Sequence, residues 1–373
     1  MKESTTASLR ARLGLALVFS STLLAQSPIL ATIDKLQKFP VDEMNTDVPA
    51  ALGPLHQQLK HQLRDFVFDA LNRGADVQTE LEKAGIRMGE QGRYGQVLGV
   101  KVEWKPNGLA TWAAVTTTLG VMCGEDMSLY LLEHDGKVWR LRLALESELS
   151  KDVSSAHGWL QYRLSRAGTD DRFFVVAANM NPWCTSVWQR LRIDAFIIEP
   201  MSRTAKRVLK EETSICIDDE LGIKVQDSTF TIEYLAEEGF LPGNRRTHVL
   251  SYAIGEGATR RVAPIALKPE DFVDEWRSLP WSEAKRWSSN QLEPWHTILK
   301  EVKFDDVPVV QPCATKNRQW QVAVPLPGDD EKAPELQEAS HIYATVIERD
   351  ANFYMQGIGT KHAPGCPADT PPQ

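Results

Sequence analysis

Residues 128–143 read SLYLLEHDGKVWRLRL, two apolar runs on either side of the dipeptide Asp135-Gly136. A tight turn with positive φ prefers this dipeptide, and flanking apolar runs make it a strong hairpin signal. The stretch therefore predicts two antiparallel strands, 127–133 and 137–145, joined by a two-residue turn. The same pairing of neighbours is expected wherever short strands follow one another without a helix between them.

From about residue 95 the hydrophobic period is two, and β-branched and aromatic residues gather in short runs between turn residues. We therefore expect a mainly β fold with antiparallel sheets, either propeller-like or a sandwich. We favour the propeller-like arrangement, although no clean repeat of about 40 to 50 residues accompanies it. The other predicted strands are 96–104, 109–119, 159–165, 172–178, 187–198, 205–210, 213–217, 229–235, 247–254 and 259–266.

An N-terminal helical segment precedes the strands. Apolar residues recur every three or four positions from Leu52 to Leu71, with Asp47 as a candidate N-cap and Gly74 as the stop. A shorter helix is predicted over 78–84. The long helix has a mixed rather than basic polar face, so we expect it to pack on its own domain and not on a membrane surface. That polar face comprises His56, Lys60, His61, Arg64, Asp65 and Asp69.

Residues 269–288 interrupt the β pattern with a short helical insert. Pro269 suits a first helical turn, and the acidic residues that follow favour the positive end of the helix. Leu279-Pro280 separates it from a second short helix that Ser282 can cap. Large tryptophan side chains can hold the insert on a sheet, and they are Trp276, Trp281 and Trp287. Strands near 297–304, 318–324, 340–348 and 352–358 are predicted to follow.

The first 31 residues carry a secretory leader pattern. Lys2, Arg10 and Arg12 precede the apolar run from Leu13 to Ala25, which is too short to cross a bilayer. We expect a signal peptide over 1–31, cleaved after Ala25 or Ala31, and no stable membrane span after processing. The remaining chain is divided into 32–94, a helical segment with a polar linker over 32–46, then 95–290, the main β domain with its insert, and 291–373, a C-terminal β unit and tail.

Composition narrows the class of protein. The chain has 373 residues, of which 42% are hydrophobic and 25% charged, and this balance is typical of a folded globular protein. The formal net charge of −8 gives no attraction to nucleic-acid phosphate, so we expect no nucleic-acid partner. Together with the leader, these features predict an exported protein, periplasmic or extracellular.

Export permits disulfides, because the destination is oxidising. The five cysteines form no C-x-x-C pair and no zinc-finger spacing. Cys216 lies in an apolar run and is expected to be a buried free thiol, whereas the other four lie beside Gly or Pro, where disulfides often tie loops. We therefore predict the pairs Cys123–Cys184 and Cys313–Cys366.

Most known catalytic motifs are absent from the sequence: it has no P-loop, no zinc-protease helix, no serine-hydrolase elbow and no dinucleotide fingerprint. Ser282 and Lys285 match the pattern S-x-x-K, but the companion K-T-G strand is missing. No cofactor is predicted, no metal is predicted from the scattered histidines, and the catalytic residues are unassigned. Acidic runs at 218–220 and 274–275 offer the paired carboxylates that glycosidase chemistry needs, but adjacent acids more often mark a solvated face or a helix start.

Eleven tryptophans are the main compositional oddity. Trp183 and Trp188 lie five residues apart and are candidate ligand-binding residues that would stack on a sugar or a peptide. The alternative is that they pack in the core of a β-rich domain.

Three segments together resemble a group of exported bacterial proteins of unknown function, over about 120–290. The segments are Cys123-Gly124 with 128–131, then 182–186 with Trp188, then 260–267 with Pro269 and 271–276. The resemblance implies an exported β-rich protein and brings no activity, ligand or site with it.

The expected function is a binding or structural β-domain of the cell envelope or extracellular space, with a carbohydrate or an envelope protein as partner. A secreted hydrolase that cleaves glycan or peptide with paired carboxylates is the alternative. A third alternative is an envelope component that docks through the helix over 48–73. An acid with a raised pKa in a cleft would favour the hydrolase, whereas an exposed tryptophan in a groove would favour the binding protein.

Overall fold

The structure is a computed structural model that describes residues 27–39, 50–89, 94–107, 110–122, 124–148, 156–181, 188–199, 202, 204–217, 221–237, 245–255, 257–302, 308–314, 318–326, 336, 339–350 and 352–367. Within these ranges the chain is mainly β, and all the paired strands run antiparallel.

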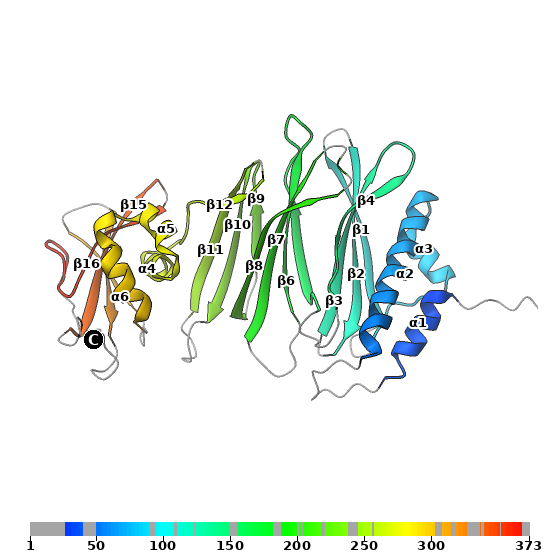
Figure 1. Cartoon of the computed structure of the whole chain (residues 1–373), viewed down its shortest axis with the longest axis horizontal. Helices are drawn as coiled ribbons and strands as arrows, with labels where there is room; N and C mark the ends of the chain where they lie inside the picture. Colours follow the sequence, from blue (N-terminus) through cyan, green and yellow to red (C-terminus); the bar gives the residue numbers. More distant parts are fainter. Residues whose placement is uncertain are drawn as a thin grey trace, which may run out of the picture.

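The described strands form three sheets that follow one another along the long axis of the molecule (Figure 1). The first sheet is an up-and-down meander of β1 (Val97–Asn107), β2 (Ala110–Val121), β3 (Gly124–His134) and β4 (Trp139–Leu145). The last sheet is a second meander of β13 (Val309–Pro312), β14 (Gln319–Pro325), β15 (His341–Arg349) and β16 (Asn352–Gly359).

The central sheet lies between these two and is bent. Its first half is β5 (Trp159–Leu164), β6 (Phe173–Met180), β7 (Trp188–Ile198) and β8 (Lys206–Ile217), and its second half is β9 (Gly222–Val225), β10 (Thr229–Glu237), β11 (Arg245–Ile254) and β12 (Thr259–Arg261). β8 reaches β10 only at the two pairs Ala236↔Ile217 and Glu237↔Cys216. Apolar residues of β6 and β7 pack on those of β9, β10 and β11, so the two halves lie face to face.

The opposite face of β6 and β7 packs on the first sheet. Four-stranded meanders therefore stack face to face, as the blades of a propeller do, but in a row that leaves the first and last sheets at opposite ends (Figure 1). The predicted class is confirmed: a mainly β, antiparallel, propeller-like fold with an N-terminal helical segment and a helical insert.

The hairpin between β3 and β4 forms as predicted, with a longer turn. Residues 135–138 connect the strands, and Gly136 has φ +90°, the left-handed region that glycine tolerates best. The Asp135 carboxylate accepts hydrogen bonds from the backbone N–H groups of Lys137 (3.0 Å) and Val138 (2.9 Å). The aspartate therefore closes the turn through its side chain.

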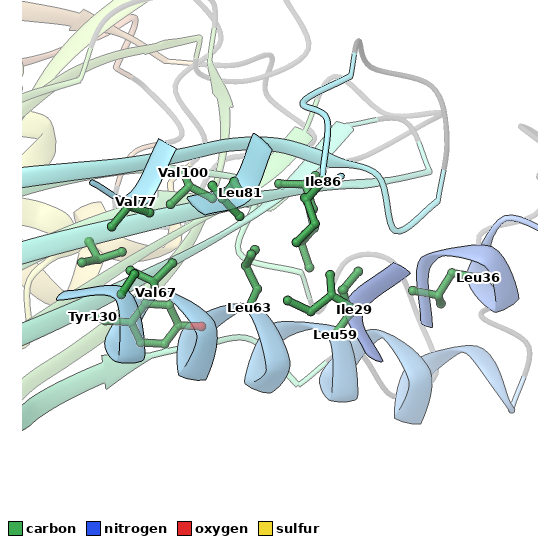
Figure 2. Close-up of a cluster of buried hydrophobic side chains, with 14 of the residues drawn as sticks. Ile29, Leu36, Leu59, Leu63, Val67, Val77, Leu81, Ile86, Val100 and Tyr130 are labelled. Carbon is green, nitrogen blue, oxygen red and sulfur yellow. The ribbon is translucent and has the colours of Figure 1, made fainter. Parts of the chain in front are cut away.

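Three helices cover the outer face of the first sheet: α1 (Pro28–Leu36), α2 (Leu52–Asn72) and α3 (Val77–Lys83). Figure 2 shows how the apolar stripe of α2, with Leu59, Leu63 and Val67, meets side chains of the other two helices and of the sheet. The predicted helix from Leu52 is confirmed. Asp47 lies outside the described residues, and Ala51 takes the N-cap position without a side-chain cap.

The helical insert packs on the last sheet. It comprises α4 (Pro269–Ser278), α5 (Trp281–Ala284) and two short 3₁₀ turns, and α6 (Glu293–Glu301) follows. Trp276 and Trp287 are buried in one cluster with Val322, Val346 and other apolar residues of β14–β16. This confirms the prediction that tryptophans hold the insert on a sheet. The N-cap of α5 is Pro280 and not the predicted Ser282.

Several sequence predictions were wrong. Residues 297–301 belong to α6 and not to a strand, because Pro294 in the first helical turn and the spacing of His296 and Leu299 favour a helix. Residues 32–36 belong to α1 and not to a linker, since Leu36 is buried against α2. β8 is one strand and not two, because Glu211 and Glu212 continue the backbone ladder by pairing with Ile193 and Arg192 of β7. β9 and β13 were missed.

Candidate functional site

The predicted ligand-binding residues fall where the structure describes little. Trp183 lies outside the described residues. Trp188 begins β7 and its backbone pairs with Cys216, but its side chain is outside the description. The ligand-binding role of both residues therefore stays a prediction. The acidic run 218–220 also lies outside the described residues, so its role stays a prediction too.

The cysteine predictions are confirmed in one case. Cys313 and Cys366 form a disulfide across a sequence separation of 53 residues. It ties the tail to the last sheet, where Gln321 also accepts a hydrogen bond from the Ala363 N–H (2.8 Å). Cys123 and Cys184 lie outside the described residues, and the side chain of Cys216 is not described.

A buried polar cluster centred on Asp126 joins α2 to the first sheet. Lys60 Nζ lies 2.6 Å and His56 Nε2 lies 2.9 Å from Asp126 Oδ2. Ser147 Oγ donates to Asp126 Oδ1 (2.8 Å), and the backbone N–H of His157 donates to the same oxygen (2.9 Å). Asp126, His56 and Lys60 are all fully buried, at 0% exposure.

The sequence analysis placed His56 and Lys60 on the solvated face of α2, and this was wrong. The two residues are one helical turn apart on the side that faces the sheet, where the carboxylate of Asp126 compensates the burial of the Lys60 charge. Lys60 Nζ also donates to Ser147 O (2.8 Å) and Ser147 Oγ (2.6 Å). In the sequence, Lys60 lies among the apolar residues Leu59 and Leu63 and looks like part of the polar face. The sequence therefore does not show that it forms a buried ion pair.

Electrostatics keeps this cluster in one protonation state. Burial opposes ionisation of Asp126, but the Lys60 charge and the His56 hydrogen bond outweigh it and hold the pKa of the carboxyl below its usual value. Burial lowers the pKa of His56 and lowers that of His157 to about 4, so both imidazoles are neutral at pH 7. Ser147 and His56 each bind Asp126 directly, so the imidazole does not stand between serine and carboxylate as a catalytic triad requires. The arrangement fixes α2 in place.

The outer face of β3 changes in character along the strand. Alternate residues of β3 point to the side of α2. This row of side chains begins with the buried Asp126 and becomes apolar and then aromatic. In order along β3, the residues are Asp126, Ser128, Tyr130, Leu132 and His134.

A group of aromatic rings, which we call the aromatic patch, lies where α2 ends; Trp104 is exposed, His134 is partly buried and Trp139 is buried, at 8% exposure. It comprises Trp104 of β1, Trp139 of β4 and His134 of β3. The Trp104 and Trp139 ring centroids are 5.5 Å apart, and those of His134 and Trp139 are 4.9 Å apart. The side chain of Asn72, the last residue of α2, accepts a hydrogen bond from the backbone N–H of Trp139 (2.8 Å).

Trp104 is the large hydrophobic residue with the greatest exposure in the described part of the chain, at 56%. Exposure rises along one face of β1, since Val100 is buried, Val102 is partly buried and Trp104 is exposed. A tryptophan in an alternating strand looks like core in a sequence, and the sequence does not show that this one lies on β1, the edge strand of the sheet.

An apolar cavity of about 230 Å³ adjoins the aromatic patch, between α2 and the first sheet. Its apolar lining comes from Val67 and Phe68 of α2 and from Val115, Tyr130, Leu132 and Leu141 of the sheet. Arg64 and Asp65 also line it, and the 67% exposure of the Asp65 side chain puts that carboxylate on the solvent side. None of the three patch residues lines the cavity, but His134 and Trp139 form the next pair but one along β3 and β4 from Leu132 and Leu141, which do.

A second charged cluster lies where α4 meets the second half of the central sheet. Arg261 NH2 lies 2.8 Å from Glu275 Oε1, and Arg246 pairs with both Glu275 (3.3 Å) and Asp274. Asp271, on the same helix, is only 6% exposed, and its Oδ2 has no hydrogen bond to the described residues. Burial and the neighbouring Glu270 raise the pKa of Asp271 to about 6.

Among the described residues, no group of three His, Cys, Asp or Glu side chains is arranged to hold a metal ion. In the same part of the chain, no helix combines the length and the apolar character that crossing a membrane requires.

Comparison with known proteins does not assign a family. No protein-family model and no curated protein sequence matches the chain. Among solved structures, similarity is found to a GH93 alpha-L-arabinofuranosidase of Fusarium graminearum in complex with arabinobiose (TM-score 0.29, 9% identity, covering 72% of this chain and 70% of that one). A xylan beta-1,4-xylosidase from Bacillus halodurans (TM-score 0.23, 9% identity, 75% and 48%) and a glycosyl hydrolase from Bacteroides ovatus (TM-score 0.23, 10% identity, 70% and 70%) are also similar. TM-scores this low carry no argument about site or activity.

Proposed function

We propose that this protein is an exported binding protein whose ligand rests on the aromatic patch at the end of α2. The observation that carries the proposal is the 56% exposure of Trp104 in contact with Trp139 beside an apolar cavity. Exposed aromatic rings next to a concave apolar surface are a usual feature of ligand sites. The face of a carbohydrate ring, or a segment of an envelope protein, would stack on such a surface.

Export is part of this proposal and rests on the leader pattern of residues 1–31, on the resemblance to exported proteins and on the Cys313–Cys366 disulfide. The packing of α1 favours one of the two cleavage points. Ile29 is buried in the core with α2, so cleavage after Ala31 would remove a core residue, whereas cleavage after Ala25 leaves α1 whole.

The test is binding of soluble glycans and envelope extracts by the mature protein, read by tryptophan fluorescence and calorimetry. Trp104→Ala should weaken binding at least tenfold, because the exposed ring supplies the stacking surface. Leu267→Ala is the matched control, since Leu267 is a 50% exposed apolar residue away from the patch. Equal binding by the two variants would contradict the proposal.

A second candidate function is favoured by a specific observation, the buried Oδ2 of Asp271 that has no hydrogen bond to the described residues. A carboxyl with a pKa of about 6 and an unpaired buried oxygen is suited to act as a general acid, and Asp274 and Glu275 supply further carboxylates on the same helix. The protein would then be a secreted hydrolase of glycan or peptide. Turnover of chromogenic glycosides or peptides that Asp271→Asn abolishes would support this candidate, and turnover unaffected by that substitution would exclude Asp271 as its acid.

A further inference from the structure

We propose that the cavity below α2 is a binding site for a compact neutral molecule, a ring or branched alkyl group that carries a single hydroxyl. Its hydrocarbon part would occupy the apolar end of the cavity, and its hydroxyl would form a hydrogen bond with the hydroxyl of Tyr130. This inference goes beyond the proposed function, because none of the three residues of the aromatic patch lines the cavity.

The cavity sets the size and the apolar character of the ligand. Its volume of about 230 Å³ exceeds the roughly 150 Å³ of an apolar protein cavity that binds benzene. Protein interiors contain few voids larger than a water molecule, so a space of this size between a helix and a sheet is unusual. Most of its lining comes from apolar side chains, among them Phe68, Leu132 and Leu141. One six-membered ring with a short alkyl substituent therefore fits.

The charges at the cavity favour a neutral ligand. Among the described residues, its charged lining consists of Arg64 and Asp65, whose side chains form an ion pair at 3.0 Å. These two charges are opposite and compensate each other. An ionised ligand would lose its hydration in the cavity without gaining an unpaired counter-charge, which is costly. A neutral ligand does not have this cost.

Tyr130 gives the cavity one buried hydrogen-bonding group. The residue lines the cavity and is 1% exposed, and its hydroxyl has no hydrogen-bond partner among the described residues. Burial raises the pKa of this hydroxyl, so it keeps its proton at pH 7 and can both donate and accept. Buried polar groups are nearly always hydrogen-bonded, and one without a partner is costly. A ligand hydroxyl beside Tyr130 would provide that partner.

The two ends of the cavity differ in character. Figure 2 shows the Tyr130 hydroxyl turned toward Leu63 of α2. Phe68 lies more than one helical turn further along the same helix, and Leu132 and Leu141 are paired across β3 and β4. A hydrogen-bonding group at one end and hydrocarbon at the other match the chemistry of a phenol or a cyclic alcohol.

The experiment measures by calorimetry how four probes bind to the mature protein: 4-methylphenol, toluene, benzylamine and benzoate. The first two differ by one hydroxyl, and the other two are a cation and an anion of similar size. We expect 4-methylphenol to bind roughly two- to tenfold more tightly than toluene, the size expected for one hydrogen bond. Both should bind more tightly than benzylamine and benzoate, because the cavity offers these no unpaired counter-charge.

Tyr130→Phe tests the hydroxyl contact. The hydroxyl of 4-methylphenol is then buried without a partner, so this probe should bind about fivefold or more weakly, while toluene binding stays within about twofold. Tyr94→Phe is the matched control and should keep the preference. Tyr94 is also a buried tyrosine of the same apolar cluster whose hydroxyl has no partner among the described residues, but it does not line the cavity. Leu141→Trp fills the apolar end and should abolish binding of both neutral probes.

The outcomes separate this inference from the proposed function. Tighter binding of benzylamine or benzoate than of toluene overturns the inference, and so does equal binding of 4-methylphenol and toluene or an unchanged ratio in Tyr130→Phe. Failure of all four probes to bind, or binding that Leu141→Trp leaves unchanged, also overturns it. Trp104→Ala should leave probe binding unchanged while it weakens binding at the aromatic patch, so either site can fail without the other. Circular dichroism of each variant checks that it is folded.

Discussion

Replacing Lys60 by methionine tests the buried cluster that holds α2 on the first sheet. The change keeps an apolar chain of similar length and removes three contacts of Nζ, to Asp126 Oδ2 (2.6 Å), Ser147 O (2.8 Å) and Ser147 Oγ (2.6 Å). The Asp126 carboxylate then stays buried without its counter-ion. Breaking one partner of a buried pair lowers the free energy of unfolding by about 3–5 kcal/mol.

That loss is large against the roughly 5–15 kcal/mol of a typical domain. It should lower the Tm of the unit containing α2 by about 6–20 °C. Thermal unfolding followed by tryptophan fluorescence measures the change. Lys83→Met is the matched control, because its solvent-exposed pair with Glu80 contributes little to stability.

Lys60→Met/Asp126→Asn completes the comparison, since the amide removes the buried charge that the first substitution isolates. The double variant should be more stable than Lys60→Met alone. If Lys60→Met lowers Tm no more than Lys83→Met, or if the double variant is less stable than both single variants, the cluster does not fasten α2 as described.

Three further predictions concern other parts of the chain. His157 has a folded pKa of about 4 and an unfolded value near 6.5, so below pH 6.5 the unfolded state gains a proton that the folded state does not. The free energy of unfolding should therefore fall by about 3 kcal/mol between pH 6.5 and 4 and level off below that. Urea unfolding of His157→Gln should lack this decline. Cys313→Ala/Cys366→Ala should destabilise the last sheet by about 4 kcal/mol, the loop-closure value for a separation of 53 residues. Calorimetry that shows the same thermal unfolding transitions with and without the disulfide would contradict this. N-terminal sequencing of the secreted protein should begin at Gln26, and a start at Thr32 would refute the role given to Ile29 in the core.

The sequence predicted the β architecture well because its signals are local. The Asp135-Gly136 turn and the alternation in β3 and β4 depend on neighbouring residues, and the structure contains both. The helix from Leu52 to Asn72 was equally visible from its apolar spacing. The stop at Gly74 also agrees, with φ +65° at that residue.

The candidate site was not visible because it depends on contacts between distant segments. Lys60 and Asp126 are 66 positions apart, and nothing near either residue indicates that they meet. Trp104 is exposed on β1, the edge strand of the first sheet, and this depends on packing and not on the strand's own sequence. Counting tryptophans directed attention to Trp183 and Trp188, whose side chains lie outside the described residues, whereas the exposed tryptophan among the described residues is Trp104.

The most direct measurement is hydroxyl-radical footprinting of the mature protein with and without saturating ligand, read by mass spectrometry at Trp104. We expect ligand to reduce oxidation of Trp104 several-fold while Met88, 43% exposed and outside the patch, is oxidised at the same rate. Unchanged oxidation of Trp104 in the presence of a ligand that binds the protein would show that the ligand lies elsewhere and would contradict the assigned site.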